Sequence, residues 1–320
     1  MRVIVPMAGR GSRLRPHTLT TPKPLLPIAG KTIVQRLVED TAAQHEGQLE
    51  EVVFVIGDFG EAVEQELLAI AENVGAKGHI RYQEQPLGTA HAIYMAEEFL
   101  EGEVIIAFAD TLFRADFKLN RSLDGVIWVK QIEDPRAFGV VTVNDDGHIT
   151  GFVEKPETPV SDLAIIGIYY LKDGAALRRE IKHLLDNDIK EKGEYQLTNA
   201  LEALRDKGGK FAPGEVDAWM DCGNKRNVLD TLAEVLHHLP QAERRAPDAL
   251  VKDGVIIEPV YLGPGAVVEQ AVVGPNVAIE ANGVVRHAVV SNSILRAHAH
   301  AADVRLDDSF LGQQARATPS

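Results

Sequence analysis

The chain has 320 residues, of which 45% are hydrophobic and 25% charged, proportions that suit a globular protein with one sizeable core and a second, smaller domain. The formal net charge of −14 argues against broad nucleic-acid binding, because that binding needs a basic face. The longest apolar runs fall well short of the roughly 20 residues that span a bilayer, so we expect no membrane partner.

Strands and helices alternate along the first half of the chain. Short apolar or β-branched runs predict buried strands at residues 3–5, 52–56, 104–108, 126–129 and 139–143. Amphipathic patterns between the early runs predict helices at about 32–45, 61–73 and 89–100. This alternation predicts an α/β fold in which a Rossmann-like, mixed but mostly parallel sheet is covered by helices on both faces.

The chain after residue 150 continues this pattern and then changes in character. Further elements are expected as strands at about 150–153 and 164–171 and as helices at about 174–190, 196–207 and 225–238. After residue 250, short apolar steps repeat: LGPGAVVEQAV from Leu262 is echoed by VGPNVAIEANG from Val273. This near-hexapeptide rhythm predicts a short parallel β-helix of three or four coils, with a few ordinary strands as the alternative.

The stretch from Met7 to Lys31, MAGRGSRLRPHTLTTPKPLLPIAGK, follows the first predicted strand. Gly9 and Gly11 let the backbone come close to a ligand, and their N–H groups can face an anion. Arg13 and Lys23 supply positive charge for phosphate oxygens. The stretch therefore predicts a triphosphate-binding loop.

Two familiar phosphate motifs do not account for this loop. Leu14 stands where a dinucleotide-binding fingerprint has its third glycine. Leu25 stands where a P-loop ending at Gly30-Lys31-Thr32 would need its first glycine, and Pro27 lacks an N–H donor.

The whole spacing G-x-G-S-R-L-x-P-x-T-x-x-x-P-K-P-L-L-P-x-x-x-K resembles the signature of the sugar-1-phosphate nucleotidylyltransferases, the group of thymidylyl-, uridylyl- and mannose guanylyltransferases. The resemblance covers about residues 1–236, and the repeats resemble the left-handed β-helix of the longer members. We therefore expect a nucleotidyltransferase catalytic domain at 1–236, a linker at 237–249 and a β-helix at 250–320. A short β-helix of this kind commonly serves subunit contact, so we expect a homo-oligomer.

The resemblance implies a nucleotide site built from two loops. The backbone at Ala8, Gly9 and Gly11 would bind the triphosphate. In the stretch from Gln83 to Ala90, base and ribose would contact Gln83, Pro86 and Gly88. An amide at Gln83 can pair with a base edge, whereas Gly88 taken alone could equally be a helix-capping residue.

A metal site is implied by two aspartates. Asp110 follows the predicted strand at 104–108, and Asp221 lies in the sequence WMDCG. In the family these positions bind Mg²⁺, an ion that prefers a few carboxylates together with phosphate oxygens and water. Ala109 and Thr111 depart from the glycine and the Asn or Asp that are common beside the first aspartate. For either aspartate alone, a role in a turn or a cap is an equal alternative.

The sugar-phosphate site is implied by three further motifs. By resemblance, Gly139 and Glu154 hold sugar hydroxyl groups and Lys155 holds the phosphate, with Glu194 as a weaker candidate. A Glu-Lys-Pro triplet by itself is usually an exposed turn.

The predicted reaction is transfer of a nucleotidyl group from a nucleoside triphosphate to a sugar 1-phosphate, with Arg13, Lys23 and Asp110 as the catalytic residues. We favour dTTP or UTP with glucose 1-phosphate because that pair is widespread in the group. The alternatives are a mannose-1-phosphate guanylyltransferase, a bifunctional enzyme whose tail transfers an acyl group with His287, His298 or His300 as base, and a regulatory subunit without catalysis. The single cysteine, Cys222, fits a reducing cytoplasm, and Met1-Arg2 leads directly into the first predicted strand, so we expect a cytoplasmic protein without a signal peptide.

Overall fold

The computed structural model describes residues 1–9, 11–44, 47–115 and 119–319. The chain divides into two compact units. Unit 1 consists of Met1–Gly9 and Leu37–Trp219, and unit 2 of Arg10–Arg36 and Met220–Ser320. The predicted triphosphate loop is therefore divided between the units after Gly9. The domain boundaries at residues 236 and 250 stay a prediction.

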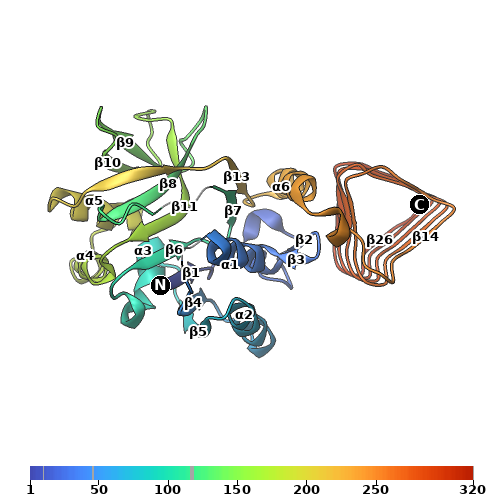
Figure 1. Ribbon diagram of the computed structural model, residues 1–320, viewed down its shortest axis with the longest axis horizontal. Helices are drawn as coiled ribbons and strands as arrows, with labels where there is room; N and C mark the ends of the chain where they lie inside the picture. Colours follow the sequence, from blue (N-terminus) through green and yellow to red (C-terminus); the bar gives the residue numbers. More distant parts are fainter. Residues whose placement is uncertain (10, 45–46, 116–118, 320) are drawn as a thin grey trace. The chain divides into compact units, whose positions relative to one another are not determined.

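Unit 1 is built on a mixed sheet with the strand order β10-β9-β11-β6-β1-β4-β5, in which β8 pairs with β11 and β12 (Figure 1). Its strands are β1 (Arg2–Pro6), β4 (Glu51–Ile56), β5 (Lys77–Tyr82), β6 (Val104–Ala107), β8 (Gly125–Gln131), β9 (Gly139–Val143), β10 (Ile149–Glu154), β11 (Leu163–Leu171) and β12 (Phe211–Glu215). Strands β6, β1, β4 and β5 run parallel, and β11 runs antiparallel to β6. The predicted α/β fold with a mixed, mostly parallel sheet is confirmed.

Helices cover this sheet. They are α1 (Ile33–Gln44), which begins in unit 2, α2 (Glu61–Asn73), α3 (Thr89–Tyr94), the 3₁₀ helix η3 (Glu97–Phe99), α4 (Gly174–Asp186) and α5 (Leu197–Asp206). Ile4, Val53 and Ile106 lie in one buried cluster with apolar residues of α3, α4 and α5. Alternate residues of the same strands, such as Val3 and Val52, are also fully buried, so both faces are covered.

Several predictions about elements in unit 1 were wrong or incomplete. The helix predicted at 89–100 ends at Tyr94, and a 3₁₀ turn follows. Strand β5 was missed because its sequence KGHIRY lies at the sheet edge and is half-exposed, so it lacks an apolar run. Strand β12, FAPGE, was missed because it contains proline and glycine, which an edge strand tolerates. The short strand β7 (Thr111–Arg114) was also not predicted.

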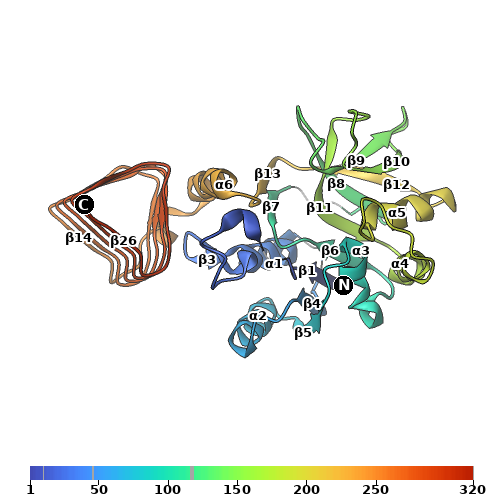
Figure 2. The same ribbon diagram turned by 180° about the vertical axis from the view of Figure 1, so that it is seen from behind.

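Unit 2 combines the rest of the triphosphate loop with the C-terminal part of the chain (Figure 2). Its elements before the repeats are η1 (Ser12–Leu14), η2 (Lys23–Leu25), β2 (Pro27–Ile28), β3 (Lys31–Thr32), the end of β13 (Ala218–Asp221), α6 (Lys225–His238) and η4 (Gln241–Glu243). Helix α6 has the predicted bounds. Its N-cap Asn224 accepts a hydrogen bond from the Asn227 N–H at 3.0 Å.

The repeats form successive coils that stack on one another, as the orange and red ribbon in Figure 1 shows. Corresponding strands of the stacked coils pair in parallel and make three sheets. The first sheet contains β14 (Leu250–Lys252), β17 (Val267–Glu269), β20 (Val284–Arg286), β23 (His300–Ala302) and β26 (Arg316–Ala317). The second contains β15 (Val255–Ile256), β18 (Val272–Val273), β21 (Val289–Val290) and β24 (Arg305–Leu306). The third contains β16 (Val260–Leu262), β19 (Val277–Ile279), β22 (Ser293–Leu295) and β25 (Phe310–Leu311).

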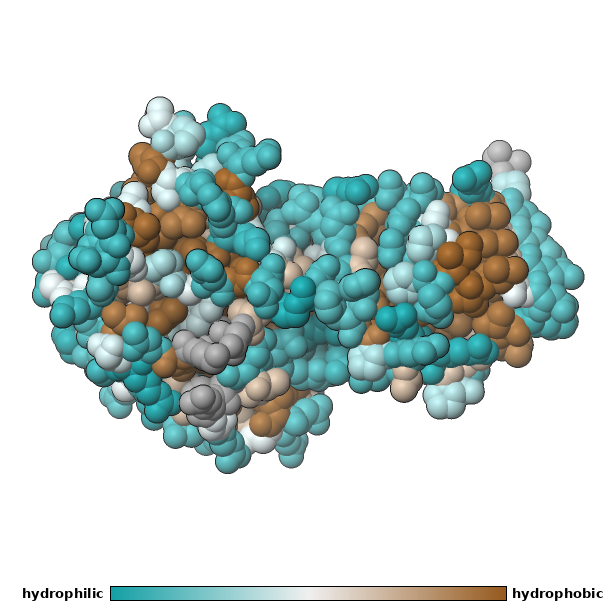
Figure 3. Space-filling model, turned by 45° about the horizontal axis from the view of Figure 1, so that its top comes forward, coloured by the Kyte–Doolittle hydropathy of each residue, from teal (hydrophilic) through white to brown (hydrophobic). Residues whose placement is uncertain are grey.

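The predicted parallel β-helix is thereby confirmed, and its left-handedness stays a prediction. Within the described residues, β14 to β25 make four complete coils of three strands each and β26 begins a further one, in agreement with the expected three or four coils. The registers place Leu250, Val267, Val284, His300 and Arg316 in line, so a coil takes only 16 or 17 residues. The β-helix part of the chain carries four exposed large aliphatic side chains, Leu250, Val255, Ile257 and Val289. Figure 3 shows a hydrophobic area on the β-helix.

Across the described ranges, the helices are too short or too polar to cross a membrane.

Candidate functional site

The predicted base-binding loop of unit 1 is braced by its own side chains. Gln83 is buried, and its Nε2 donates to the Gly88 carbonyl at 3.1 Å and lies 3.0 Å from His91 Nδ1. Burial lowers the pKa of His91, so the neutral ring can accept through Nδ1. Because the two N–H groups of the amide are then engaged, the side-chain oxygen of Gln83 is the atom that a base edge would meet.

Gly88 is required by a close backbone approach. Its φ of +124° lies in the region that favours glycine, and a Cβ there would come within 2.4 Å of the Tyr195 carbonyl oxygen. The neighbouring backbone pairs with Tyr195, since Tyr195 N donates to Leu87 O and Ala90 N donates to Tyr195 O, both at 2.9 Å. Gly88 also precedes α3, but close packing explains it better than capping does. Pro86, on the same loop, is exposed.

Asp110 lies in an exposed turn at the carboxyl end of β6, and Ala8 and Gly9 follow the end of the neighbouring β1. Carboxyl ends of parallel strands are where α/β sheets bind ligands. The departure at Thr111 has a structural reason. This residue is buried, and its hydroxyl accepts a hydrogen bond from Trp219 Nε1 at 2.7 Å.

The sugar-phosphate candidates Gly139, Glu154 and Lys155 lie together. Gly139 and Glu154 are register partners on β9 and β10, and a Cβ on Gly139 would lie 3.2 Å from Glu154 Oε2. Thr198 donates to the same oxygen at 3.2 Å, and Lys155 Nζ lies 3.3 Å from Glu154 Oε1. The result is a carboxylate aimed over a bare glycine beside an ammonium group, an arrangement able to bind hydroxyl groups next to a phosphate.

Lys155 has an unusual backbone conformation that is supported by hydrogen bonds to its N–H and to its carbonyl oxygen. Its φ is 42°, in the left-handed region, and its N–H donates to Phe138 O at 3.1 Å. Lys192 Nζ donates to the carbonyl oxygens of both Lys155 and Glu154. The sequence assigns no role to Lys192 or Thr198; Thr198 stands in the stretch Glu194-Tyr-Gln-Leu-Thr, which is the signal that could have indicated it.

Tyr169 connects the sugar-phosphate cluster with Asp110. It is buried, and its ring lies edge-on to Phe108 at 6.0 Å. Burial raises the pKa of Tyr169, and the carboxylates of Glu154 and Asp110 raise it further. Tyr169 lies on β11, which pairs with β6, the strand before Asp110, and with β9, the strand that begins at Gly139. Asp110 and the sugar-phosphate candidates are therefore carried by the same sheet of unit 1.

Glu194 is exposed and bonded to a different neighbour. It accepts from Gln196 Nε2 at 3.2 Å, and Gln196 Oε1 accepts from the Thr89 hydroxyl at 3.2 Å. These bonds connect Glu194 with the α3 loop rather than with the Glu154 cluster.

In unit 2, the triphosphate loop folds around Gly11. Its φ is +59°, its carbonyl accepts from the Thr18 hydroxyl at 2.8 Å, and a Cβ there would lie 2.7 Å from Lys23 Cβ. The aliphatic stem of Lys23 is thus packed against the bare face of Gly11, and Lys23 is buried. Arg13 lies exposed on η1, which Leu14 anchors in the core.

Asp221, also in unit 2, is held at the start of α6. Its Oδ1 accepts from Gly223 N at 2.9 Å, and its Oδ2 accepts from the Asn227 side chain. Each oxygen keeps a second lone pair, so the carboxylate remains a suitable hard ligand for Mg²⁺. Among the described residues, no three His, Cys, Asp or Glu side chains gather as a metal cluster, and a site of two carboxylates needs none. Asp110 and Asp221 belong to different units, and their convergence stays a prediction.

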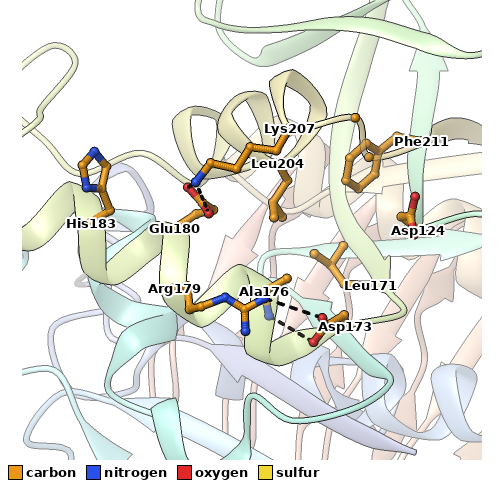
Figure 4. A pocket seen from close by; sticks show the side chains of 12 residues that line it. Asp124, Leu171, Asp173, Ala176, Arg179, Glu180, His183, Leu204, Lys207 and Phe211 are labelled. Atoms are coloured by element: carbon orange, nitrogen blue, oxygen red, sulfur yellow. Dashed lines mark hydrogen bonds and ion pairs between the residues drawn. The ribbon is translucent and has the colours of Figure 1, made fainter.

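A cavity of about 570 Å³ in unit 1 lies elsewhere (Figure 4). It lies between α4, α5 and β12, and four of its charged residues form two pairs: Lys207 Nζ lies 2.6 Å from Glu180 Oε1, and Arg179 Nη2 lies 3.8 Å from Asp173 Oδ2. None of the described residues that line it belongs to the predicted site.

Comparison with known proteins agrees with the signature loop. A family model described as nucleotidyl transferase matches residues 2–238. Glucose-1-phosphate thymidylyltransferase of Streptomyces antibioticus is 30% identical over 278 residues, 83% of this chain and 74% of that protein. The bifunctional protein GlmU of Methanococcus maripaludis is 27% identical over 81% of this chain, and the low-salt glycan biosynthesis nucleotidyltransferase Agl11 of Haloferax volcanii is 30% identical over 74% of it.

The chain spans 62% of the length of that GlmU protein and 66% of Agl11. A crystal structure of UDP-glucose pyrophosphorylase complexed with UDP-glucose has the same fold. Its TM-score is 0.60 at 22% identity, with 74% of this chain and 99% of that chain covered.

Proposed function

Because this chain belongs to the nucleotidyl transferase family, as a sugar-1-phosphate nucleotidyltransferase, we propose that it joins dTTP or UTP to glucose 1-phosphate. The products are a nucleoside diphosphate sugar and pyrophosphate. The assignment of a sugar 1-phosphate as substrate is supported by the cluster of Gly139, Glu154 and Lys155. Its carboxylate can accept hydrogen bonds from sugar hydroxyl groups, and the neighbouring ammonium group can bind phosphate.

The reaction needs no general base. A phosphomonoester has its second pKa near 6, so the phosphate of the sugar 1-phosphate is already largely ionised at neutral pH. Its oxygen attacks the α-phosphorus in line, and the bond from the α-phosphorus to the bridging oxygen of pyrophosphate breaks. Catalysis then rests on alignment and charge neutralisation. Arg13 stabilises the leaving pyrophosphate, Lys23 binds the triphosphate, and Lys155 orients the attacking phosphate.

We propose that Asp110 and Asp221 hold Mg²⁺. When bound, the ion supplies charge neutralisation on phosphate oxygens. Both aspartates offer carboxylate oxygens, and hydrogen bonds from Gly223 and Asn227 orient Asp221 for that task.

The choice of base and sugar rests on chemistry and on likeness. The oxygen of Gln83 suits a ring N–H donor, which thymine, uracil and guanine all carry, and the Streptomyces relative is a glucose-1-phosphate thymidylyltransferase. The test is pyrophosphate release from each of four triphosphates with several sugar 1-phosphates and Mg²⁺. The highest kcat/KM is expected for dTTP or UTP with glucose 1-phosphate. A maximum for GTP with mannose 1-phosphate would overturn this choice.

Two further measurements test whether the tail is an acyltransferase and whether the chain is a regulatory subunit. Acetyl transfer from acetyl-CoA to an amino-sugar phosphate would indicate a bifunctional enzyme, for which His287 and His298 are exposed on the β-helix. Binding of sugar nucleotides without turnover of any pair would indicate a regulatory subunit.

The Glu154→Ala variant is expected to raise the KM for glucose 1-phosphate by about 10- to 100-fold, because a hydrogen bond to a charged group contributes about 1.5–3 kcal/mol. The KM for the triphosphate should change less than threefold. Steady-state kinetics with each substrate varied measures both. Glu157→Ala, which removes an exposed carboxylate three residues on, serves as the control. Equal rises in both KM values would contradict the assignment of Glu154 to the sugar.

We also propose that the chain forms a homo-oligomer through its β-helix. The second sheet carries Val255, Val272 and Val289 in register, and Val255 and Val289 are 56% and 42% exposed. The first three residues of this column are uncharged, and the first charged residue in it is Arg305. We therefore propose that the column packs against the same surface of a second copy of the chain.

The Val289→Glu variant is expected to lower the molar mass in solution to that of one chain, since a charge in an apolar interface is costly. Light scattering after size exclusion measures the mass. Val143→Glu, at a site 41% exposed on β9, is the matched control and should keep the wild-type mass. A monomeric wild-type protein, or an unchanged mass for Val289→Glu, would contradict this interface.

A further inference from the structure

One outward face of the β-helix is buried within unit 2. In the third sheet, Tyr261, Ala278, Ile294 and Phe310 occupy one register column. Their neighbours Leu262, Ile279 and Leu295 belong to the interior core of the coils, so this column points outward. Ala278 and Ile294 are nevertheless fully buried and Phe310 is 8% exposed. What covers this face includes residues of the triphosphate loop.

Glu280, directly after β19, holds one end of that loop. It is 5% exposed, and its Oε1 accepts from Gly30 N at 3.2 Å. Arg36 binds the same turn, donating to the carbonyls of Ile28 at 3.0 Å and Ala29 at 2.8 Å. Gly30 has a φ of +84°, and a Cβ there would meet the Tyr261 hydroxyl at 2.2 Å, so Tyr261 covers this turn closely.

Arg296, directly after β22, holds the other part of the loop. It is 6% exposed, and it donates to the Thr21 hydroxyl at 3.0 Å and to the His17 carbonyl at 3.4 Å. The His17 ring stacks on Phe310 at 4.0 Å. Burial, followed by the charges of Arg296 and Lys225, lowers the pKa of His17, which keeps the stacked ring neutral.

These contacts bracket the loop residue that we assign to the triphosphate. Lys23 lies between Thr21 and Gly30, and Arg13 lies four residues before His17. Because a buried polar or charged side chain is costly without partners, Glu280 and Arg296 are unfavourable to place at this face alone. Each one directs its hydrogen bonds to the loop.

We propose that Glu280 and Arg296 are positioning residues that hold residues 11–31 in the triphosphate-binding conformation, so that the β-helix is a structural part of the nucleotide site. This inference rests on the proposed function for its kinetic consequences, whereas the contacts themselves do not depend on it. It gives the β-helix a role in nucleotide affinity in addition to oligomerisation.

The kinetic test compares Glu280→Ala and Arg296→Ala with the wild-type full-length protein. Each is expected to raise the KM for the triphosphate by about 10- to 100-fold, because small misplacements of binding groups cost that much. The KM for the sugar 1-phosphate should stay within threefold. Glu280→Gln should retain most of the affinity, since its amide oxygen still accepts from Gly30.

A second readout is independent of activity. Hydrogen exchange of peptides covering residues 11–36 should be faster in both alanine variants, because these residues lose contacts with the β-helix. Glu269→Ala and Arg286→Ala are the matched controls. These two residues pair with each other at 3.1 Å on the first sheet, and Arg286 is half-exposed. The controls should exchange at the wild-type rate in residues 11–36.

The Thr21→Val variant tests the contact between Arg296 and the loop by changing the loop residue. It removes the nearer of the two acceptors of Arg296 and leaves the sequence of the β-helix unchanged, so it tests the inference even if an alanine variant does not fold. Faster exchange and a raised triphosphate KM in Thr21→Val support the inference.

The pH dependence of stability gives a further check. Burial raises the pKa of Glu280 from its ordinary value of 4.5 to about 7, against the opposing effects of the Gly30 and Ala29 amides, Arg36 and Arg296. Tyr261 faces the same carboxyl, and burial raises the pKa of its hydroxyl. Between pH 4.5 and about pH 7, Glu280 keeps its proton in the folded chain but has released it in the unfolded chain. The free energy of unfolding therefore falls as the pH rises from 4.5 to about 7. Glu280→Gln has no such proton, and its unfolding temperature should fall less between pH 5 and 8.

Wild-type exchange and wild-type KM values in Glu280→Ala, Arg296→Ala and Thr21→Val would overturn the inference. A wild-type protein that is inactive with all substrate pairs would overturn the proposed function instead. In that case the exchange arm still decides whether the β-helix holds the loop.

Discussion

Replacing Arg13 with alanine is expected to lower kcat by about 10²–10³-fold, with a Tm close to that of the wild type. Removing one preorganised electrostatic contact to a charge that develops in the transition state typically costs about 2.7–4 kcal/mol. Arg13 is exposed on η1, whereas the neighbouring Leu14 provides the packing, so the substitution should cost little stability. The measurement is single-turnover pyrophosphate release at saturating substrates, with thermal unfolding as the check on folding.

The control for Arg13 is Arg15→Ala. Arg15 is also exposed and lies two positions further along, after η1 has ended. Both variants change the net charge of the loop by the same amount, so a general electrostatic effect would slow them equally. Equal kcat values for the two variants would remove Arg13 from the mechanism.

The Asp110→Asn variant is expected to lower kcat by about 10²–10³-fold at low millimolar Mg²⁺ and to need more Mg²⁺ for half-maximal rate. An amide keeps the size of the side chain but loses the negative charge that a hard cation prefers. Asp110 lies exposed in a turn, so its Tm should stay near that of the wild type. A titration of the initial rate with Mg²⁺ measures both effects.

Asp146→Asn is the control for this carboxylate. Asp146 is exposed in the turn between β9 and β10 and has no assigned role, so its Mg²⁺ dependence should be that of the wild type. If Asp110→Asn showed the wild-type rate and the wild-type Mg²⁺ dependence, the metal would have to be held elsewhere.

The central strands could be predicted because a strand buried on both faces has a continuous run of apolar residues in its sequence. Strand β4 reads EVVFVI and β6 reads VIIA, and all residues of these runs except Glu51 are buried. Edge strands have no such run. The half-exposed β5 and the proline-containing β12 were therefore invisible to the same reasoning.

The site divides in a similar way. Gly139, Glu154 and Lys155 follow from the family resemblance, and the structure adds the reason for their spacing, since β9 and β10 pair Gly139 with Glu154 across a hairpin. Glu280 and Gly30, by contrast, are 250 positions apart, and a charged residue at the end of a repeat strand looks like ordinary solvent-facing surface. Nothing local in the sequence indicates that such a charge is buried.

Transfer of a nucleotidyl group to a sugar 1-phosphate can be observed directly by ³¹P NMR of the protein with dTTP, glucose 1-phosphate and Mg²⁺. We predict that the glucose 1-phosphate resonance is replaced by the two resonances of a nucleoside diphosphate sugar, with one pyrophosphate formed for each. Release of orthophosphate with unchanged glucose 1-phosphate would contradict the proposed reaction.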